Sequence, residues 1–310
     1  MKKFNHIIFL LALPILLKAQ LPQLIIVAGQ TVNLPARTYQ YSNINIQTGG
    51  KLIIDESSQT WCILFCTGNV QIHGEIIFHK FYSTRDAVNA ITPNGEPLAY
   101  SFKMLNLGGN GGYGGECATS GIPTRGIGGS GSAGTLEYGG GGGAGAASRG
   151  YPNRYQANGS NANGNSGGRR QLATDGDGGN GEVRGQYGNG GLLFIFCQND
   201  FDGTNGEIHL EGEDGVNGID GIDGQSSFGA DAGGGGGGGG APGGEGGKFT
   251  VRTKGNYVSY PIVYVQGGQG GKGGKGKNNP RANLFTPPLR GGDNGQDGHN
   301  GASGVVDYLK

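Results

Sequence analysis

The spacing of glycine is the feature that most constrains how this chain can fold. In several runs after residue 107, glycine occupies every third position, and in some of them a second glycine stands directly beside it. This spacing suits a threefold left-handed extended helix, which rises about 3.1 Å per residue and can leave one edge without side chains. We therefore predict that several runs of one chain pack side by side as a polyglycine II bundle, with their glycines inward. The clearest series are Gly212, Gly215, Gly218, Gly221 and Gly224, then Gly267, Gly270, Gly273 and Gly276, and then Gly292, Gly295, Gly298, Gly301 and Gly304.

Collagen and disorder are the two competing interpretations of the glycine-rich region. The periodic runs contain no proline, and each is only about a dozen residues, or about 40 Å, long. Both features argue against a collagen trimer, whose chains are long and stiffened by proline. Chains rich in glycine, serine and asparagine often lack a core, so we expect flexibility in the octaglycine 233–240 and in residues 148–170.

Short apolar segments, separated by a few turn residues, indicate β-strands, and no helical period appears. The segment 43–78 resembles the rungs of a right-handed parallel β-helix, in which each turn stacks its apolar residues on the turn before. We predict an all-β chain, a parallel β-helix-like solenoid with polyglycine II runs and long loops. The expected strands are 24–27, 31–34, 44–46, 51–54, 61–66, 70–72, 75–78, 192–197, 207–210, 248–252 and 257–265.

The alternation of strands and glycine runs between about residues 107 and 304 resembles two kinds of protein. One is the receptor-binding tip of some phage tail fibres, and the other is the glycine-rich surface protein of bacteria. The resemblance implies a role in recognition or adhesion. It rests on architecture, and it carries no binding motif onto particular residues of this chain.

The N-terminus has the layout of a secretory signal peptide. Lys2 and Lys3 precede an apolar run that ends near Ala19, and this run is too short to span a bilayer comfortably. An Ala-Gln junction at the cut resembles exported proteins of the Bacteroidetes type. We predict a signal at residues 1–19, a β-rich part at 20–106 and a glycine-rich part at 107–310. The mature chain is then secreted, to the cell surface or the extracellular space more than to the periplasm, without membrane insertion after cleavage.

Charge gives no sign of a polyanionic partner. Without the three lysines of the signal, 20 basic and 23 acidic residues remain, a formal net charge of −3. This excludes the strongly basic surface expected for binding nucleic acid or anionic lipid. Acidic residues of the run 212–224 and lysines of the run 267–277 could face each other and set the register of the runs, or they could simply keep the runs soluble.

Four cysteines leave two alternatives open. An even number in an exported protein permits two disulfides, whereas buried free thiols are the other interpretation. Cys62 and Cys66 lie about 13 Å apart along one expected strand, too far for a bridge between them. We assign Cys66 and Cys197 a structural role. The Cys-x3-Cys pattern on a strand does not match the usual spacing of zinc ligands.

Chemistry-bearing motifs are few. Residues 178–183 approximate one copy of a calcium-binding nonapeptide, and Asp175, Asp177 and Glu182 form an oxygen-rich cluster, so calcium is the one cofactor that the sequence suggests. The competing interpretation is a solvated acidic turn. No phosphate-binding loop follows the glycine runs, and no histidine outside the signal sits in a nucleophile motif. We therefore expect a protein that is not an enzyme, with a polysaccharide lyase or hydrolase as the remaining alternative.

Tyrosines beside the glycine-rich segments offer a binding surface. Tyrosine among Gly, Ser and Asn supplies rigid contact area beside adaptable polar groups, and sugars stack on such rings. The alternative is that these rings only shield the bundle. We predict an adhesion or recognition protein that binds surface glycans or other cell-surface components, and the alternative is a purely structural matrix component that associates with itself. The candidate binding residues are Tyr113, Tyr138, Tyr151, Tyr155 and Tyr187.

Overall fold

A computed structural model gives the arrangement of most of the chain. Within the part it describes, every regular element is a β-strand, and no helix has the length and hydrophobicity to cross a membrane. The described residues are 20–55, 60–79, 87–91, 97–101, 108–117, 127–134, 140, 142–144, 146–149, 155–157, 160–162, 188–224, 233–278 and 289–310.

Fifteen of the strands form three parallel sheets of five strands each. The first sheet contains β1 (Leu24–Ile26), β4 (Ile44–Ile46), β7 (Val70–Ile72), β14 (Phe201–Asp202) and β17 (Tyr257–Ser259). The second contains β2 (Thr31–Pro35), β5 (Lys51–Asp55), β8 (Glu75–Phe78), β15 (Glu207–His209) and β18 (Ile262–Tyr264). The third contains β3 (Thr38–Tyr41), β6 (Trp61–Cys66), β13 (Leu192–Cys197), β16 (Lys248–Thr253) and β19 (Val305–Leu309).

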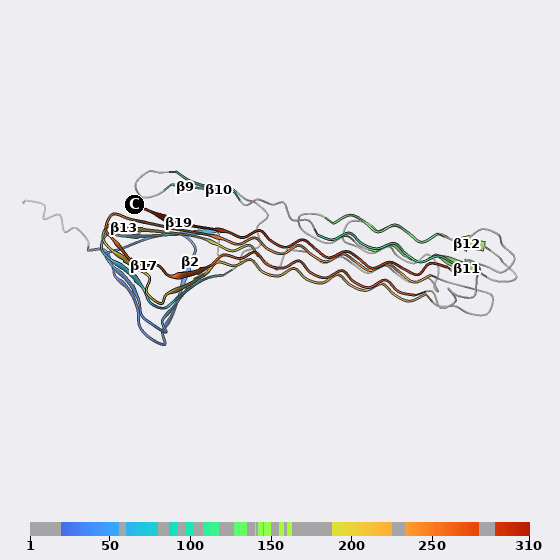
Figure 1. Cartoon of the computed structure of the whole chain (residues 1–310), viewed down its shortest axis with the longest axis horizontal. Coiled ribbons are helices and arrows are strands. Elements are labelled where there is room, and N and C mark those ends of the chain that lie inside the picture. The colour runs from blue at the N-terminus through green and yellow to red at the C-terminus, as the bar shows by residue number, and fades with distance from the viewer. Residues whose placement is uncertain are drawn as a thin grey trace, which may run out of the picture.

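The order of strands is that of a stack of rungs. The chain passes through the first, second and third sheets in turn and then advances by one strand, so each rung contributes one strand to each sheet. The five rungs are β1-β2-β3, β4-β5-β6, β7-β8-β13, β14-β15-β16 and β17-β18-β19. This arrangement is consistent with a β-helix-like solenoid, and Figure 1 shows its three-sided outline.

Apolar side chains of successive rungs stack inside the three sheets. In the first sheet, Ile26, Ile46 and Ile72 are in register and fully buried. Alternate residues of β5 are buried, because successive side chains of a strand point to opposite faces. All six residues of β13 are buried, which agrees with its continuous apolar sequence.

A ladder of Asn and Asp side chains marks the corner between the third and first sheets. The backbone N–H of Asn69 donates to Oδ1 of Asn43 at 3.0 Å. Asp200 donates in the same way to Asn69 at 3.2 Å, and Asn256 to Asp200 at 2.8 Å. Each side chain thus satisfies a backbone donor of the next rung, which holds the turns in register. The sequence signal is Asn or Asp directly before an apolar strand.

The predicted strands are confirmed, with boundaries shifted by one or two residues at most, except that 257–265 forms two strands. Three strands of the parallel sheets were missed: β3, β14 and β19. Residues 83–106, expected to be a linker, include the antiparallel pair β9 (Ala87–Ile91) and β10 (Pro97–Ser101), and a second pair joins β11 (Ala147–Arg149) and β12 (Tyr155–Ala157). Strands from both sides of residue 106 share the same sheets; for example, β13 pairs with β6.

The four cysteines all lie in the described ranges, and all are buried without a disulfide. Cys66 and Cys197 face each other on neighbouring strands, but their thiols donate to different turn carbonyls, those of Asn69 and Gly68 among them. Burial raises the pKa of the Cys66 thiol to about 11 and that of Cys62 to about 12. The structure therefore agrees with the alternative of buried, protonated thiols.

Candidate functional site: the glycine-rich rod

Three long excursions leave the solenoid at one corner, between the second and third sheets. They connect β8 to β13, β15 to β16, and β18 to β19. The first two rungs turn this corner with short connections instead, such as the one from Pro35 to Thr38. Figure 1 shows the excursions running together as a long rod. Segments far apart in the sequence therefore lie side by side because their rungs are stacked.

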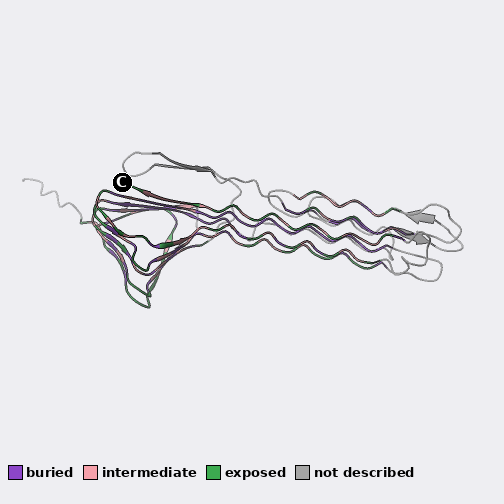
Figure 2. Cartoon of the chain, viewed as in Figure 1, coloured by how far each residue is buried: buried purple, intermediate pink, exposed green. Residues whose placement is uncertain are grey.

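One run lies at the centre of the rod, and we call residues 233–247 the inner run. Every residue of this run is buried, including the octaglycine 233–240. Figure 2 shows these buried traces surrounded by partly exposed ones. The octaglycine is therefore an ordered, central element, and our expectation of flexibility there was wrong. Most of residues 148–170 lie outside the described ranges.

Backbone hydrogen bonds connect the inner run to five neighbouring runs of the rod and, close to the solenoid, to Gly190. Three successive positions donate in three directions: Gly235 to Ile222, Gly236 to Gly143, and Gly237 to Asp293, at 2.8–2.9 Å. Each direction repeats every third residue, as a threefold helix requires. In the opposite sense, N–H groups of runs 108–117 and 265–278 donate to carbonyls of the inner run.

These neighbours explain why the octaglycine lacks side chains in more than one of its three phases. A Cβ added at Gly234, Gly236 or Gly237 would come closer than 3.0 Å to a carbonyl of a neighbouring run. Runs 210–224 and 289–304 need a bare position at every third residue, where they meet the inner run. Run 265–278 needs two of every three positions bare, because it also packs against both of these runs. All seven glycines that we assigned a structural role meet an inner-run carbonyl in this way: Gly212, Gly215, Gly218, Gly221, Gly292, Gly295 and Gly298.

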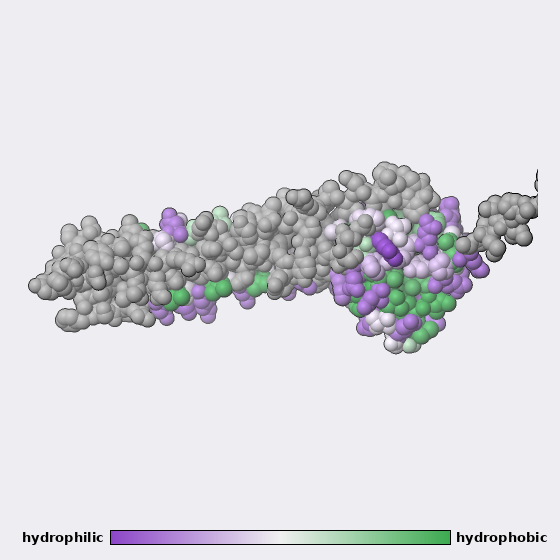
Figure 3. Space-filling view, turned by 180° about the vertical axis from the view of Figure 1, so that it is seen from behind, coloured by the Kyte–Doolittle hydropathy of each residue, from purple (hydrophilic) through white to green (hydrophobic). Residues whose placement is uncertain are grey.

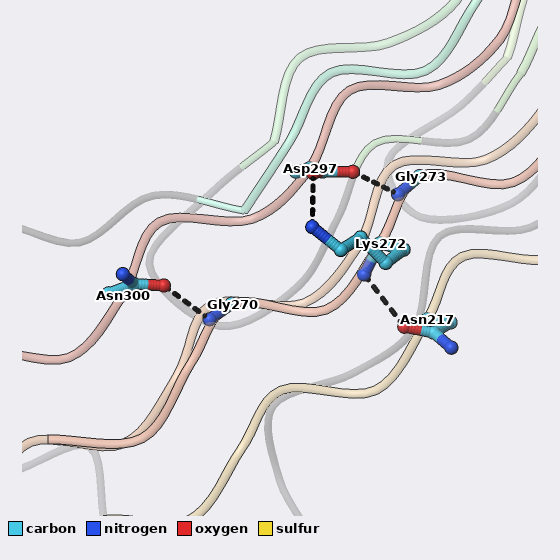
Figure 4. A network of polar contacts seen from close by, with 6 residues as sticks. All are labelled: Asn217, Gly270, Lys272, Gly273, Asp297 and Asn300. Atoms are coloured by element: carbon cyan, nitrogen blue, oxygen red, sulfur yellow. Dashed lines mark hydrogen bonds and ion pairs between the residues drawn. The ribbon is translucent and has the colours of Figure 1, made fainter.

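Asn and Asp side chains accept hydrogen bonds from those backbone N–H groups of the outer runs that do not bond to the inner run. In run 265–278, one set of N–H groups bonds the inner run. A second set bonds Oδ1 of Asp214, Asn217 and Asp220 at 2.7 Å. The third set bonds Oδ1 of Asn294, Asp297 and Asn300 at 2.9 Å. Figure 4 shows three of these acceptors, Asn217, Asp297 and Asn300, with the N–H donors of Gly270, Lys272 and Gly273. The repeated Asx-Gly pair in the sequence is the signal for this role, which our sequence analysis missed.

Ion pairs also connect run 265–278 to its two neighbours, runs 210–224 and 289–304. Lys277 pairs with Asp220 at 3.2 Å, as expected for acidic and basic runs that face each other. Lys272 instead pairs with Asp297 of run 289–304, at 3.0 Å. These ion pairs are largely exposed, so each stabilises the rod by at most about 1 kcal/mol.

Backbone donors also shift the acidity of two of these carboxylates. The N–H of Lys275 lowers the pKa of Asp220, helped by the ammonium group of Lys277. The N–H of Gly273 lowers the pKa of Asp297, helped by Lys272. The charged form is favoured because it accepts these hydrogen bonds more strongly than the protonated form.

Of the five tyrosines predicted to bind, Tyr113 is the one whose side chain the structure describes. It is 53% exposed on run 108–117, and the Arg290 guanidinium carbon lies 5.9 Å from the centre of its ring. Tyr155 belongs to β12, but its side chain is outside the description. Tyr138, Tyr151 and Tyr187 lie outside the described residues, as do the calcium candidates Asp175, Asp177 and Glu182.

Apolar side chains also face outward from the rod. Ile219 and Ile222 are 47% and 52% exposed on run 210–224, and Ile127 is 64% exposed on run 127–134. Together with Tyr113 and Arg290 they give the rod a mixed apolar and charged surface. Among the residues that the structure describes, no group of three or more His, Cys, Asp or Glu side chains could hold a metal ion.

No family model, no curated protein and no solved structure matches this chain.

Two adjacent positions test whether glycine phase holds the rod together. Gly218 faces the inner run, whereas Ile219 points outward. We expect Gly218→Val to lower the free energy of unfolding by about 2–4 kcal/mol, because Cβ displaces the Gly238 carbonyl. Ile219→Val also introduces valine, but at the outward-facing position, and it should change the free energy of unfolding by less than about 0.5 kcal/mol. Urea denaturation measures both, and equal stabilities of the two variants would contradict this arrangement.

Acid should weaken the rod through Asp220 and Asp297. Their pKa values are lowered on folding, so the unfolded chain takes up protons first as the pH falls below the ordinary value of 3.8. Stability that is present above 3.8 is then lost progressively below it. In Asp220→Asn/Asp297→Asn, Oδ1 still accepts the backbone bond but no longer titrates.

Melting temperatures across this pH range measure the effect. On acidification, we expect the melting temperature of the double Asn variant to fall less than that of the unchanged chain. The corresponding double Ala variant, which lacks the acceptor, should be less stable at every pH. Parallel pH profiles for the unchanged chain and the Asn variant would show that these carboxylates do not contribute.

Proposed function

We propose that this chain is a secreted adhesion or recognition protein of a cell surface, in which a parallel β-helix carries a polyglycine II rod. Its ligands are surface glycans or other cell-surface components. The observation that carries the proposal is that three excursions leave one corner and pack around a buried inner run. Such a rod holds outward side chains at a distance from the solenoid on a rigid support, as binding sites require.

The far end of the rod is the proposed contact region. Runs 210–224 and 233–247 are joined there through residues 225–232, and runs 265–278 and 289–304 through residues 279–288. Exposed Tyr113, with Arg290 beside it, combines a flat ring with a fixed donor. Sugar rings stack on aromatic faces and bond to guanidinium groups through their hydroxyls, which favours a glycan as the ligand.

Binding to intact cells and to a panel of polysaccharides tests the proposal, using the chain that begins at Gln20. We expect saturable binding without release of soluble sugar. Tyr113→Ala should weaken binding by about threefold to tenfold, since an aromatic contact contributes about 0.5–1.5 kcal/mol. Gln71→Ala is the control, because Gln71 is exposed but lies on β7 in the middle of the solenoid.

Other outcomes separate the alternatives. Release of sugar from the polysaccharide would favour an enzyme. Loss of binding in chelator would favour a calcium site near residues 175–182. No binding to any surface would contradict adhesion and leave a structural matrix component as the better account.

A further inference from the structure

Within the described residues, the two ends of the solenoid core are less completely covered than its middle. Inward-facing residues of the middle rungs, such as Leu52 and Leu64, are fully buried. In the first rung, Leu24 and Ile26 of β1 are buried, but the counterparts in β2 and β3 are only partly buried, and so are those of the last rung. Apolar surface of the kind that one rung buries against the next is therefore left uncovered at each end. These partly buried residues are Val32, Leu34 and Tyr39 in the first rung, and Tyr257, Val263, Val265, Val306 and Tyr308 in the last.

Both ends also present unpaired strand edges. Within the described residues, β1, β2 and β3 each have a neighbour on one side only, and so do β17, β18 and β19. Exposed parallel edges are templates for another chain. Figure 3 shows hydrophobic residues gathered on the solenoid, whereas along the rod they appear as small separate spots. At the last rung, Val258 and Ile262 are more than half exposed.

The Asn and Asp ladder has a direction, and its last member is Asn256. Each Oδ1 binds the N–H of the next rung, from Asn43 to Asn69, Asp200 and Asn256. Asn256 belongs to the last rung, and within the described part of the chain no donor lies on its Oδ1. At the other end, Gln23 occupies the equivalent place in the first rung, because Leu24 pairs with Ile44.

We propose that a second copy of this chain covers each open end, with the last rung of one copy stacked on the first rung of the next. The occupant is a second copy because the two ends share one cross-section of three parallel strands. Stacking continues ladders that already pair five rungs within the chain. The N–H of Gln23 of the next copy then donates to Asn256, and the partly buried residues of the two rungs cover each other.

The position of the rod leaves room for this assembly. The excursions leave rungs three to five, whereas the first two rungs make short turns at the same corner. Five rungs advance by about 24 Å at the usual spacing of about 4.8 Å between strands. Head-to-tail contacts of one kind do not close on themselves, so they generate a filament. The filament would carry one binding rod per copy, which adds multivalency to adhesion without depending on the identity of the ligand.

The first rung already carries one feature that limits the strength of this contact. Ala36 donates to Asp55 of β5, so Pro35 faces the open edge, where it offers no N–H. By the same alternation Gln40 faces the open edge, because Arg37 and Tyr41 accept from β6 and its following turn. Gln40→Pro therefore removes a donor from the edge without removing a bond within the chain.

Two variants, each blocked at one end, test the proposal. The chain is purified after export and its N-terminus is verified. Gln40→Pro blocks the first rung, and Asn256→Lys blocks the last rung at an exposed residue. Gln71→Lys, an exposed change on β7 in the middle of the solenoid, is the matched control. Thermal melting checks that each variant folds, and sedimentation velocity over a wide concentration range measures assembly.

We expect the unchanged chain and Gln71→Lys to form a concentration-dependent series of oligomers. Gln40→Pro and Asn256→Lys should each remain monomeric, but mixing them should give a dimer with one copy of each, joined through the two intact ends. Electron microscopy of the unchanged chain should show filaments with an axial repeat of about 24 Å. A monomeric unchanged chain, or blocked variants that still oligomerise alone, would overturn the proposal, whether or not the rod binds glycans.

Discussion

The need to satisfy backbone N–H groups governs this structure more than the burial of side chains does. A glycine-rich chain buries little apolar surface, and a buried backbone donor without an acceptor is strongly unfavourable. The rod meets this requirement by bonding run to run, with the octaglycine 233–240 where neighbours surround it on several sides. The solenoid supports that solution because its stacked rungs bring the ends of distant runs to one corner.

Asn and Asp side chains supply the acceptors where backbone carbonyls are not in place. At a corner of the solenoid, Asn69 and its equivalents bond the next rung. On the rod, Asn217 and Asp297 serve the same purpose for run 265–278. Asn and Asp side chains thus accept hydrogen bonds from extended backbone both in the solenoid and in the rod. The charge of Asp adds a dependence on pH, but Asn at equivalent positions shows that geometry is the shared requirement.

Much of this fold could be predicted from local pattern. Apolar strands such as Trp61–Cys66 are visible in the sequence, and so is the threefold phase of Gly212–Gly224. What could not be predicted depends on the surroundings. A run of eight glycines reads as a flexible linker until its neighbours are known, and Val305–Leu309 is a strand because β16 offers it an edge. Of the candidate binding residues, Tyr113 alone has a side chain that the structure describes. The sequence shows its aromatic ring, but it does not show that the ring is exposed.

Hydrogen–deuterium exchange of the inner run tests most directly whether backbone bonding orders the rod. The account predicts that amides of residues 233–247 are protected about as strongly as those of β13, because both segments are buried and hydrogen-bonded. Exchange of the octaglycine amides at the rate of an unstructured chain, while β13 stays protected, would contradict it.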